Sequence, residues 1–211
     1  IIGNGKFNNN NSFKETSINL KINKSNKTLR FGVGTINEEG QFLGSYSSGA
    51  YSIKDFSKSF FYNLESRYKL NKDLLIHSNY TKFDTMVDMA YDNFVNIKDL
   101  KSNEFSTGII FSNLMNNKGK VKFNYTIPLA TTSGELTHYT TKGYKTNGSY
   151  NSVTEKHSLR NDSRESRIDL MYDYKILPNM KILSMINYTM NDQGVKNKNN
   201  YKVYSSLSFS F

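Results

Sequence analysis

The residues of this chain that could carry out catalysis or hold a metal are few and scattered. The three histidines, His77, His138 and His157, lie in different segments and lack the short spacing of zinc ligands. Cysteine is absent, which excludes disulfides, thiolate metal sites and cysteine nucleophiles. No Gly-x-Ser-x-Gly nucleophile elbow occurs, and the Gly32-x-Gly34 pair lies inside a strand-like run and opens no helix. We therefore expect no catalytic residue, no metal and no cofactor, and we expect that the chain is not an enzyme.

A larger set of charged residues recurs at alternate positions between apolar ones. Because alternate residues of a strand share a face, these side chains are predicted to line one watery face of a sheet. They could form a solvated lumen in which mixed charges pair across strands. They could also line a conduit through which an unfolded polypeptide or a linker helix passes. The set is Arg30, Glu65, Arg67, Lys69, Glu104, Lys122, Glu165, Arg167, Asp169, Asp173 and Lys202.

The elements that would position these residues show a period of two in segments of about ten residues. In 60–70, Phe, Tyr and Leu alternate with Asn, Glu, Arg and Lys, so one face is apolar and the other charged. The same alternation recurs in segments 18–22, 29–33, 74–80, 105–111, 121–129, 168–176, 182–188 and 203–211. The segment Gln41–Ser52 is small and Gly-rich and is predicted as a weaker strand.

The composition is too polar for an ordinary core and too aromatic for a disordered chain. Hydrophobic residues make up 36% and aromatic residues 14%, mean hydropathy is −0.63, and no apolar run approaches the roughly 18 residues of a membrane helix. A sheet with one lipid-covered and one watery face explains both facts. We predict an all-β transmembrane antiparallel up-and-down β-barrel in the bacterial outer membrane, with 10–12 strands here and 12 in the full barrel, any missing strands preceding Ile1.

Turn signals divide the chain into a short lead-in and a barrel. Residues 1–12 are expected to be a linker or partial lead-in, and residues 13–211 the barrel. Long connections at 84–103, 130–162 and 191–200 are predicted as loops exposed at the cell surface, the first with a short helix in 84–99. Residues 134–143 could pair with 149–158 as an outside hairpin, or both could cross the membrane. Short turns are expected inside at 37–40, 71–73, 116–119 and 177–180, with 23–28 and 53–57 on the outer side.

The carboxyl end carries a pattern of its own. Val203, Leu207, Phe209 and Phe211 alternate with polar residues and place an aromatic at the last position. This arrangement resembles the signal by which bacterial outer-membrane proteins are handed to the barrel-assembly machinery. We therefore expect outer-membrane lipid and that machinery as partners.

Three segments resemble the autotransporter barrels that follow subtilisin-type serine-protease passengers. Lys120–Gly134 is similar to their "Gln-Pro-Leu-Arg-Val…Gly" strand. Residues 158–170 are similar to their "Ser-Leu-Ser-Pro-Ser-Gly-Arg-Glu-Ile-Asp-Leu-Glu-Leu" stretch, and Leu64–Asp84 is similar to a hairpin of the family. Asn161 and Ser163 replace the family's Pro and Gly, which bears on the passenger type more than on the barrel. The resemblance implies a translocator of type V secretion that anchors its own N-terminal passenger and assists its export.

The net charge of +10 raises the alternative of polyanion binding. The lysines are spread along the chain and concentrate in turns, so no nucleic-acid partner is predicted. Two other classes stay open on the sequence. One is a stand-alone porin or adhesin whose outside loops act, and the other is a soluble basic β-sandwich that binds polyanions.

Overall fold

Antiparallel strands make up most of this protein. The structure is a computed structural model, and it describes residues 2–6, 12–43, 45–46, 53, 56–90, 94–144, 146 and 150–209. The strands are β1 (Ile2–Lys6), β2 (Ser12–Lys24), β3 (Lys27–Glu39), β4 (Gln41–Phe42), β5 (Ser45–Tyr46), β6 (Phe56–Lys69), β7 (Leu74–Met86), β8 (Val95–Asn113), β9 (Gly119–Tyr144), β10 (Tyr150–Ser158), β11 (Ser166–Leu177), β12 (Met180–Met190) and β13 (Asn200–Phe209). The helical turns are α1 (Leu114–Asn117) and η2 (Asp192–Gly194).

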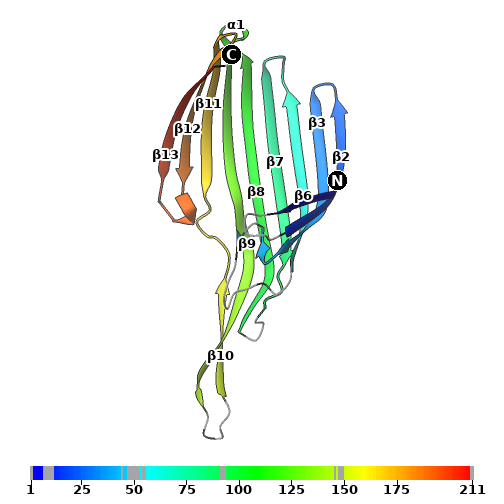
Figure 1. Ribbon diagram of the computed structural model, residues 1–211, viewed down its shortest axis with the longest axis vertical. Helices are drawn as coiled ribbons and strands as arrows, with labels where there is room; N and C mark the ends of the chain where they lie inside the picture. The colour runs from blue at the N-terminus through cyan, green and yellow to red at the C-terminus, as the bar shows by residue number, and fades with distance from the viewer. Residues whose placement is uncertain are drawn as a thin grey trace.

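Eleven strands form one sheet in which neighbours in the chain are neighbours in space. The hydrogen-bonded order is β1-β2-β3-β6-β7-β8-β9-β11-β12-β13, with β10 paired to β9 off this path. Every pairing is antiparallel (Figure 1). The predicted all-β, up-and-down arrangement with ten strands in sequence is therefore confirmed. The described strands make an open sheet, because β1 and β13 occupy its two edges and no pairing among the described residues joins them.

The ten strands are not the ten that the sequence predicts, because Gln41–Ser52 does not cross the sheet. Its described residues form β4 and β5, which pair only with each other, whereas residues 44 and 47–52 lie outside the described residues. The prediction of a strand there is wrong, and its small, Gly-rich residues offer few apolar side chains for one face of a sheet. β3 pairs directly with β6 instead.

Removal of that strand reverses the predicted direction of the two strands before it. The turn at Ser25–Asn26 now lies at the same end as 70–73, 114–118 and 178–179, here called the short-turn end. The predictions that 23–28 lies on the outer side and 37–40 on the inner side are therefore wrong. Residues 37–40 lie at the opposite end, here called the long-connection end, with 86–90, 94–95 and 190–200.

The segment 130–162 is an extension of the sheet and not a pair of further crossings. Residues 135–144 of β9 pair with β10 in an antiparallel hairpin, which projects beyond the long-connection end (Figure 1). Of the two alternatives left open by the sequence, the hairpin is the one that the structure has. In the described part of 84–99, residues form strand and turn and no helix, and the lead-in contributes β1 to the edge of β2.

The described chain has almost no apolar interior. Its buried hydrophobic residues are Ile53, Met89, Val95 and Leu100, all near the long-connection end. No helix in the described ranges is long and apolar enough to cross a membrane. A sheet of this size therefore carries its apolar side chains on its surface.

Candidate lumenal face

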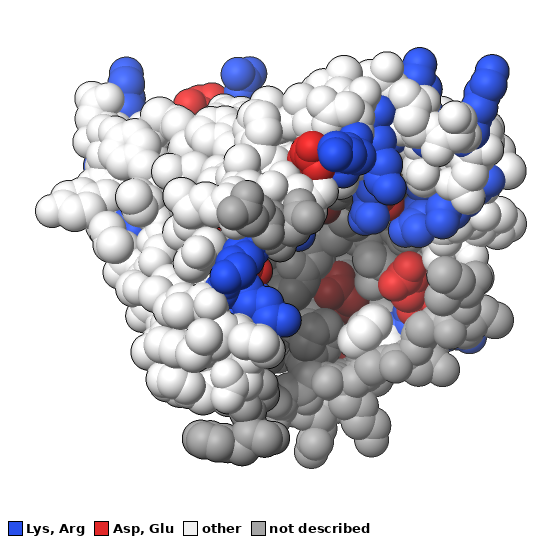
Figure 2. All heavy atoms as spheres, turned by 90° about the horizontal axis from the view of Figure 1, so that it is seen from above, with Lys and Arg blue, Asp and Glu red and all other residues white. Residues whose placement is uncertain are grey.

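The strand register divides the side chains of the sheet into two faces. Arg30 lies opposite Glu65, and Glu65 lies opposite Asn79. Because directly opposed residues of antiparallel strands share a face, such pairs can be followed across the sheet. They define an inner face, which carries Glu65, and an outer face, which carries Leu64. Inner-face residues line two grooves, and Figure 2 shows the hollow that they surround, seen from above the short-turn end.

The outer face is apolar over nine successive long strands. Ile18 is 75% exposed, Val203 67% and Leu20 60%. Other exposed outer-face residues are Ile22, Leu29, Phe31, Val33, Phe60, Tyr62, Tyr80, Phe111, Phe123, Leu170, Ile186, Tyr188, Tyr201, Leu207 and Phe209. The outer-face charges flank these rows: Lys14, Lys24, Lys27, Glu39, Lys58, Lys82, Asp84 and Lys101.

Lysines and aromatic rings meet at both ends of the apolar rows. Lys27 Nζ lies 4.9 Å from the centroid of the Tyr68 ring near the short-turn end. Lys58 Nζ lies 4.9 Å from the Phe60 ring and Lys82 Nζ 5.6 Å from the Tyr62 ring toward the long-connection end. Such amphipathic pairs suit the two boundaries between hydrocarbon and water.

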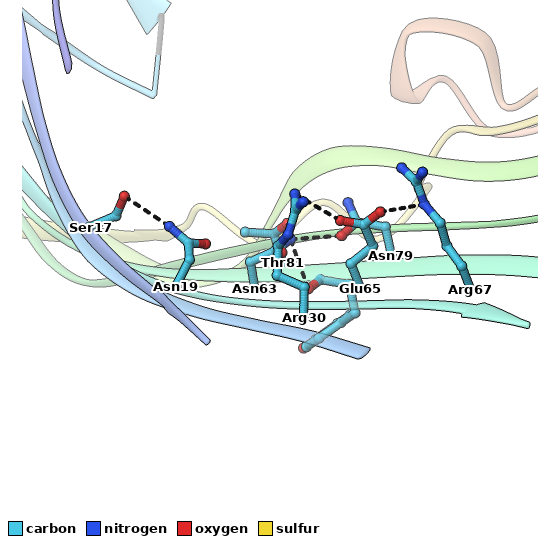
Figure 3. Close-up of polar contacts among 9 residues, drawn as sticks. Ser17, Asn19, Arg30, Asn63, Glu65, Arg67, Asn79 and Thr81 are labelled. Atoms are coloured by element: carbon cyan, nitrogen blue, oxygen red, sulfur yellow. Dashed lines mark hydrogen bonds and ion pairs between the residues drawn. The ribbon is translucent and has the colours of Figure 1, made fainter. Parts of the chain in front are cut away.

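On the inner face, Glu65 is held by two arginines. Its Oε2 lies 3.2 Å from Arg30 Nη1, and its Oε1 lies 2.7 Å from Arg67 Nε. Figure 3 shows the three side chains rising from the same face of β3 and β6. The Glu65 side chain is only 18% exposed, so its charge needs these partners. Two cations and one anion leave a net positive charge at this point.

Beside this cluster, amides and hydroxyls connect three strands. Asn63 Nδ2 donates to Asn79 Oδ1 at 2.7 Å and to Thr81 Oγ1 at 2.9 Å (Figure 3). Thr81 Oγ1 in turn donates to Glu104 Oε1 at 2.9 Å. The network ties β6, β7 and β8 through side chains as well as backbone, and it leaves a polar, uncharged surface between charged groups.

A second groove lies over β11, β12 and β13. Asn187 Nδ2 donates to Asp169 Oδ1 at 2.6 Å, and Arg167 Nε lies 2.5 Å from Glu165 Oε1. Lys202 and Tyr204 line the same groove. Closer to the short-turn end, Lys181 Nζ lies 2.7 Å from Asp173 Oδ2.

The structure brings most of the predicted lumenal residues onto one face. Ten lie on the inner face by register: Arg30, Glu65, Arg67, Lys69, Glu104, Lys122, Arg167, Asp169, Asp173 and Lys202. Glu165 lies just before β11 and lines the second groove. Whether that face encloses a lumen stays a prediction.

The uncharged partners of these charges are not among the residues that were predicted to line the lumen. Asn63, Asn79 and Asn124 occupy the same alternate positions, but single amides in an Asn-rich chain gave no signal. Because they alternate in step with the charged residues along each strand, they lie on the same face, and this position could have identified them.

The predicted assembly signal lies on the outer face of β13. Val203, Leu207 and Phe209 pair with Ile186, Ile182 and Met180 of β12 and are exposed. Phe211 lies outside the described residues. Recognition by the barrel-assembly machinery stays a prediction. Among the described residues no group of three or more histidines and carboxylates could hold a metal ion.

Comparisons with known proteins gave a structural likeness alone. No protein-family model and no curated protein matches the chain. Among solved structures it is similar to the TodX monoaromatic hydrocarbon channel deltaS2 mutant, at 8% sequence identity and a TM-score of 0.48. The match covers 94% of this chain and 60% of the channel, so this chain spans less than two thirds of that protein's length.

Proposed function

We propose that this chain is the membrane-embedded translocator of an outer-membrane autotransporter, which anchors an upstream passenger and assists its export. The barrel would close around the inner face with further strands or a further part of the protein. Lipid, the barrel-assembly machinery and the passenger are the proposed partners.

One observation carries the membrane part of the proposal. Nine successive strands expose their apolar side chains, whereas only four hydrophobic residues of the described chain are buried. Monomeric soluble proteins rarely expose a contiguous apolar patch larger than a few hundred Å². Hydrocarbon covers such a surface without requiring a protein partner. It accepts strands whose backbone groups are paired, as they are between neighbours in the sheet, and closure of the proposed barrel would pair the two edge strands as well.

The lengths of the strands agree with this environment. β2, β3 and β7 each have 13 residues, β6 has 14 and β12 has 11. A tilted strand needs roughly 9–11 residues to cross the hydrocarbon. Each of these five strands is therefore long enough to span the layer, and in the proposed barrel the lysines and tyrosines near the strand ends would lie in the headgroup regions.

Support for export comes from the inner face and from the sequence resemblance. The inner face carries charges of both signs together with amides and hydroxyls, which can form hydrogen bonds with an extended polypeptide. It has no large apolar surface among the described residues that would bind the polypeptide tightly. The segments 64–84, 120–134 and 158–170 resemble autotransporter barrels.

Expression of the native gene at full length tests the proposal. We expect the full-length protein to require detergent for extraction and to migrate faster on gels before heating than after. We also expect protease added to intact cells to cleave its upstream region. A detergent-independent monomer would contradict the membrane assignment. A barrel that leaves the upstream region inaccessible, or a gene with a signal peptide directly before Ile1, would contradict the autotransporter assignment alone.

A stand-alone outer-membrane adhesin is the second candidate, because the hairpin of β9 and β10 projects well beyond the sheet (Figure 1). Such a hairpin could present a binding surface. Loss of cell binding on deletion of 136–157, in a protein that displays no upstream region and keeps its heat-modifiable migration, would favour this candidate.

A further inference from the structure

The charges of the inner face are separated along the strands. Some inner-face residues lie no more than four positions from the short-turn end of their strand. Among these, basic residues outnumber acidic ones. The basic residues are Lys21, Arg30, Arg67, Lys69, Lys120, Lys122, Lys175 and Lys181, and the acidic residues are Glu65 and Asp173. Toward the long-connection end, the acidic residues are Glu15, Glu38, Glu104, Glu165 and Asp169, and the basic residues are Arg167 and Lys202.

Both acidic groups of the short-turn half are already engaged. Glu65 is shared by two arginines, and Asp173 pairs with Lys181. For the side chains of Lys21, Lys69, Lys120, Lys122 and Lys175, no hydrogen bond or ion pair with another described residue occurs. Within the described part of the chain, five ammonium groups of this half therefore have no ion-pair or hydrogen-bond partner.

Two of these ammonium groups, those of Lys122 and Lys175, line grooves rather than an open plane. Lys122 lines one groove together with Arg67 and His77. Figure 2, seen from this end, shows lysine and arginine side chains around the hollow. Cations that line a concave, low-dielectric wall reinforce one another's field and raise the local concentration of anions.

We propose that the short-turn half of the inner face is a binding surface for oxyanions, the carboxylate or phosphate groups of a solute or segment entering from that side. The inference rests on the proposed barrel, because closure gives these lysines a shared aqueous space. Rings of Lys and Arg serve anion and phosphate pores in the same way. The surface would attract anionic groups to the short-turn mouth, and the more acidic half beyond it would weaken their hold.

Protection of lysines from an amine-acylating reagent tests the proposal on the folded protein in detergent at low salt. Tripolyphosphate is expected to slow acylation of Lys120 and Lys122 several-fold, as measured by peptide mass spectrometry, and spermine is not. Lys58 and Lys82 on the outer face are the internal controls and should react at an unchanged rate. High salt should abolish the protection, since the Debye length falls to about 3 Å at 1 M.

An oligo-glutamate peptide in place of tripolyphosphate shows whether polypeptide carboxylates are accepted as well as phosphate. Protection by either probe supports the proposal. Equal rates with and without both probes, or equal protection of Lys58 and Lys82, would overturn it. Gel migration of the same sample distinguishes the anion-binding surface from the barrel itself. If the protein is heat-modifiable but its lysines are not protected from acylation, only the anion-binding surface is contradicted. If the protein shows no heat-modifiable migration, the barrel is contradicted as well.

Ion selectivity in a planar bilayer gives a second measurement. We expect the protein to favour chloride over potassium under a salt gradient. In the K120Q/K122Q variant this permeability ratio should be lower by about twofold for each charge removed, because a permeating ion would pass on the order of 8 Å from each ammonium group in water. The K58Q/K82Q variant has the same net charge and should keep the parent ratio. A cation-selective parent would contradict the proposal.

Discussion

His77 and Asn124, which are 47 positions apart in sequence, meet across the strand that separates them. His77 Nε2 lies 3.1 Å from Asn124 Oδ1, and the residue between them on β8 is Gly108. A Cβ on Gly108 would lie 2.8 Å from His77 Nε2 and 2.5 Å from the Phe123 carbonyl oxygen, and it would overlap Asn124 Oδ1. The hydrogen bond therefore exists because residue 108 has no side chain.

The substitution Gly108→Ala should break this contact and destabilise the sheet. We expect a loss of about 1–3 kcal/mol in the free energy of unfolding, because neither the backbone carbonyl nor the two side chains can withdraw without losing a partner. Urea titration in lipid vesicles, followed by heat-modifiable migration, measures the loss. Gly143→Ala is not a matched control, because Gly143 has a φ of 105°. Ser106→Ala, on the same face of β8, is the matched control. An equal loss of stability in that variant would contradict the steric explanation for Gly108→Ala.

Removal of the Glu65 carboxylate should destabilise the protein more than removal of an exposed one. In Glu65→Gln, Arg30 and Arg67 remain close without an anion between them, and we expect a cost of about 1–3 kcal/mol. Asp162→Asn breaks a pair whose side chains are 67% and 83% exposed and should cost about 0–1 kcal/mol. The two urea midpoints can be compared directly. Equal values would show that the Glu65 cluster is no more than a solvated ion pair.

A charge placed on the outer face should be penalised by lipid, whereas the same charge on the inner face should not. Phe123 is an outer-face residue of β9 and Thr126 an inner-face residue three positions away. We expect Phe123→Lys to cost about 2–4 kcal/mol more than Thr126→Lys, because a lysine near the bilayer midplane loses its hydration. Folding yields and urea midpoints in vesicles measure the difference. A smaller cost for Phe123→Lys would mean that water or protein covers this face.

The projecting hairpin should respond to acid through the ion pair of Glu135 and Lys156, which is shorter than the Lys142–Glu155 pair beside it. Lys156 Nζ lies 2.8 Å from Glu135 Oε1; this hydrogen bond lowers the pKa of the Glu135 carboxyl and raises the pKa of the Lys156 ammonium. The carboxyl's contribution is present above its unfolded pKa and is lost as pH falls through its folded pKa. The ammonium's contribution is present below its unfolded pKa and is lost as pH rises through its folded pKa. Both are therefore present at neutral pH.

We expect amide protection factors in 135–144 and 150–158 to be constant near neutrality and to decrease in acid below the lowered pKa of Glu135. Hydrogen exchange across a pH series measures them. Glu135→Gln should lower protection at neutral pH and remove the decrease in acid. An identical profile in the variant would assign the acid response to another group.

The sequence alone determined the two faces of the sheet. In 60–70 and 121–129 apolar and polar residues alternate with few exceptions, such as Phe61 and Ser66, and a slip of one residue would turn charges onto the apolar face, so the register follows from local pattern. For the same reason the inner-face positions of Glu65, Lys122 and Asp169 could be predicted without knowledge of their neighbours.

Only the tertiary structure decided which segments cross and which side chains meet. Gln41–Ser52 and 134–158 contain strand-forming residues, but whether a strand joins the sheet depends on the edge available to it, and β6 occupies the edge of β3 while β10 pairs with β9 beyond the sheet. His77 reaches Asn124, and Arg30 reaches Glu65, through pairings between distant segments. Such pairings depend on register across several strands, and period-two alternation carries no information about which strands become neighbours.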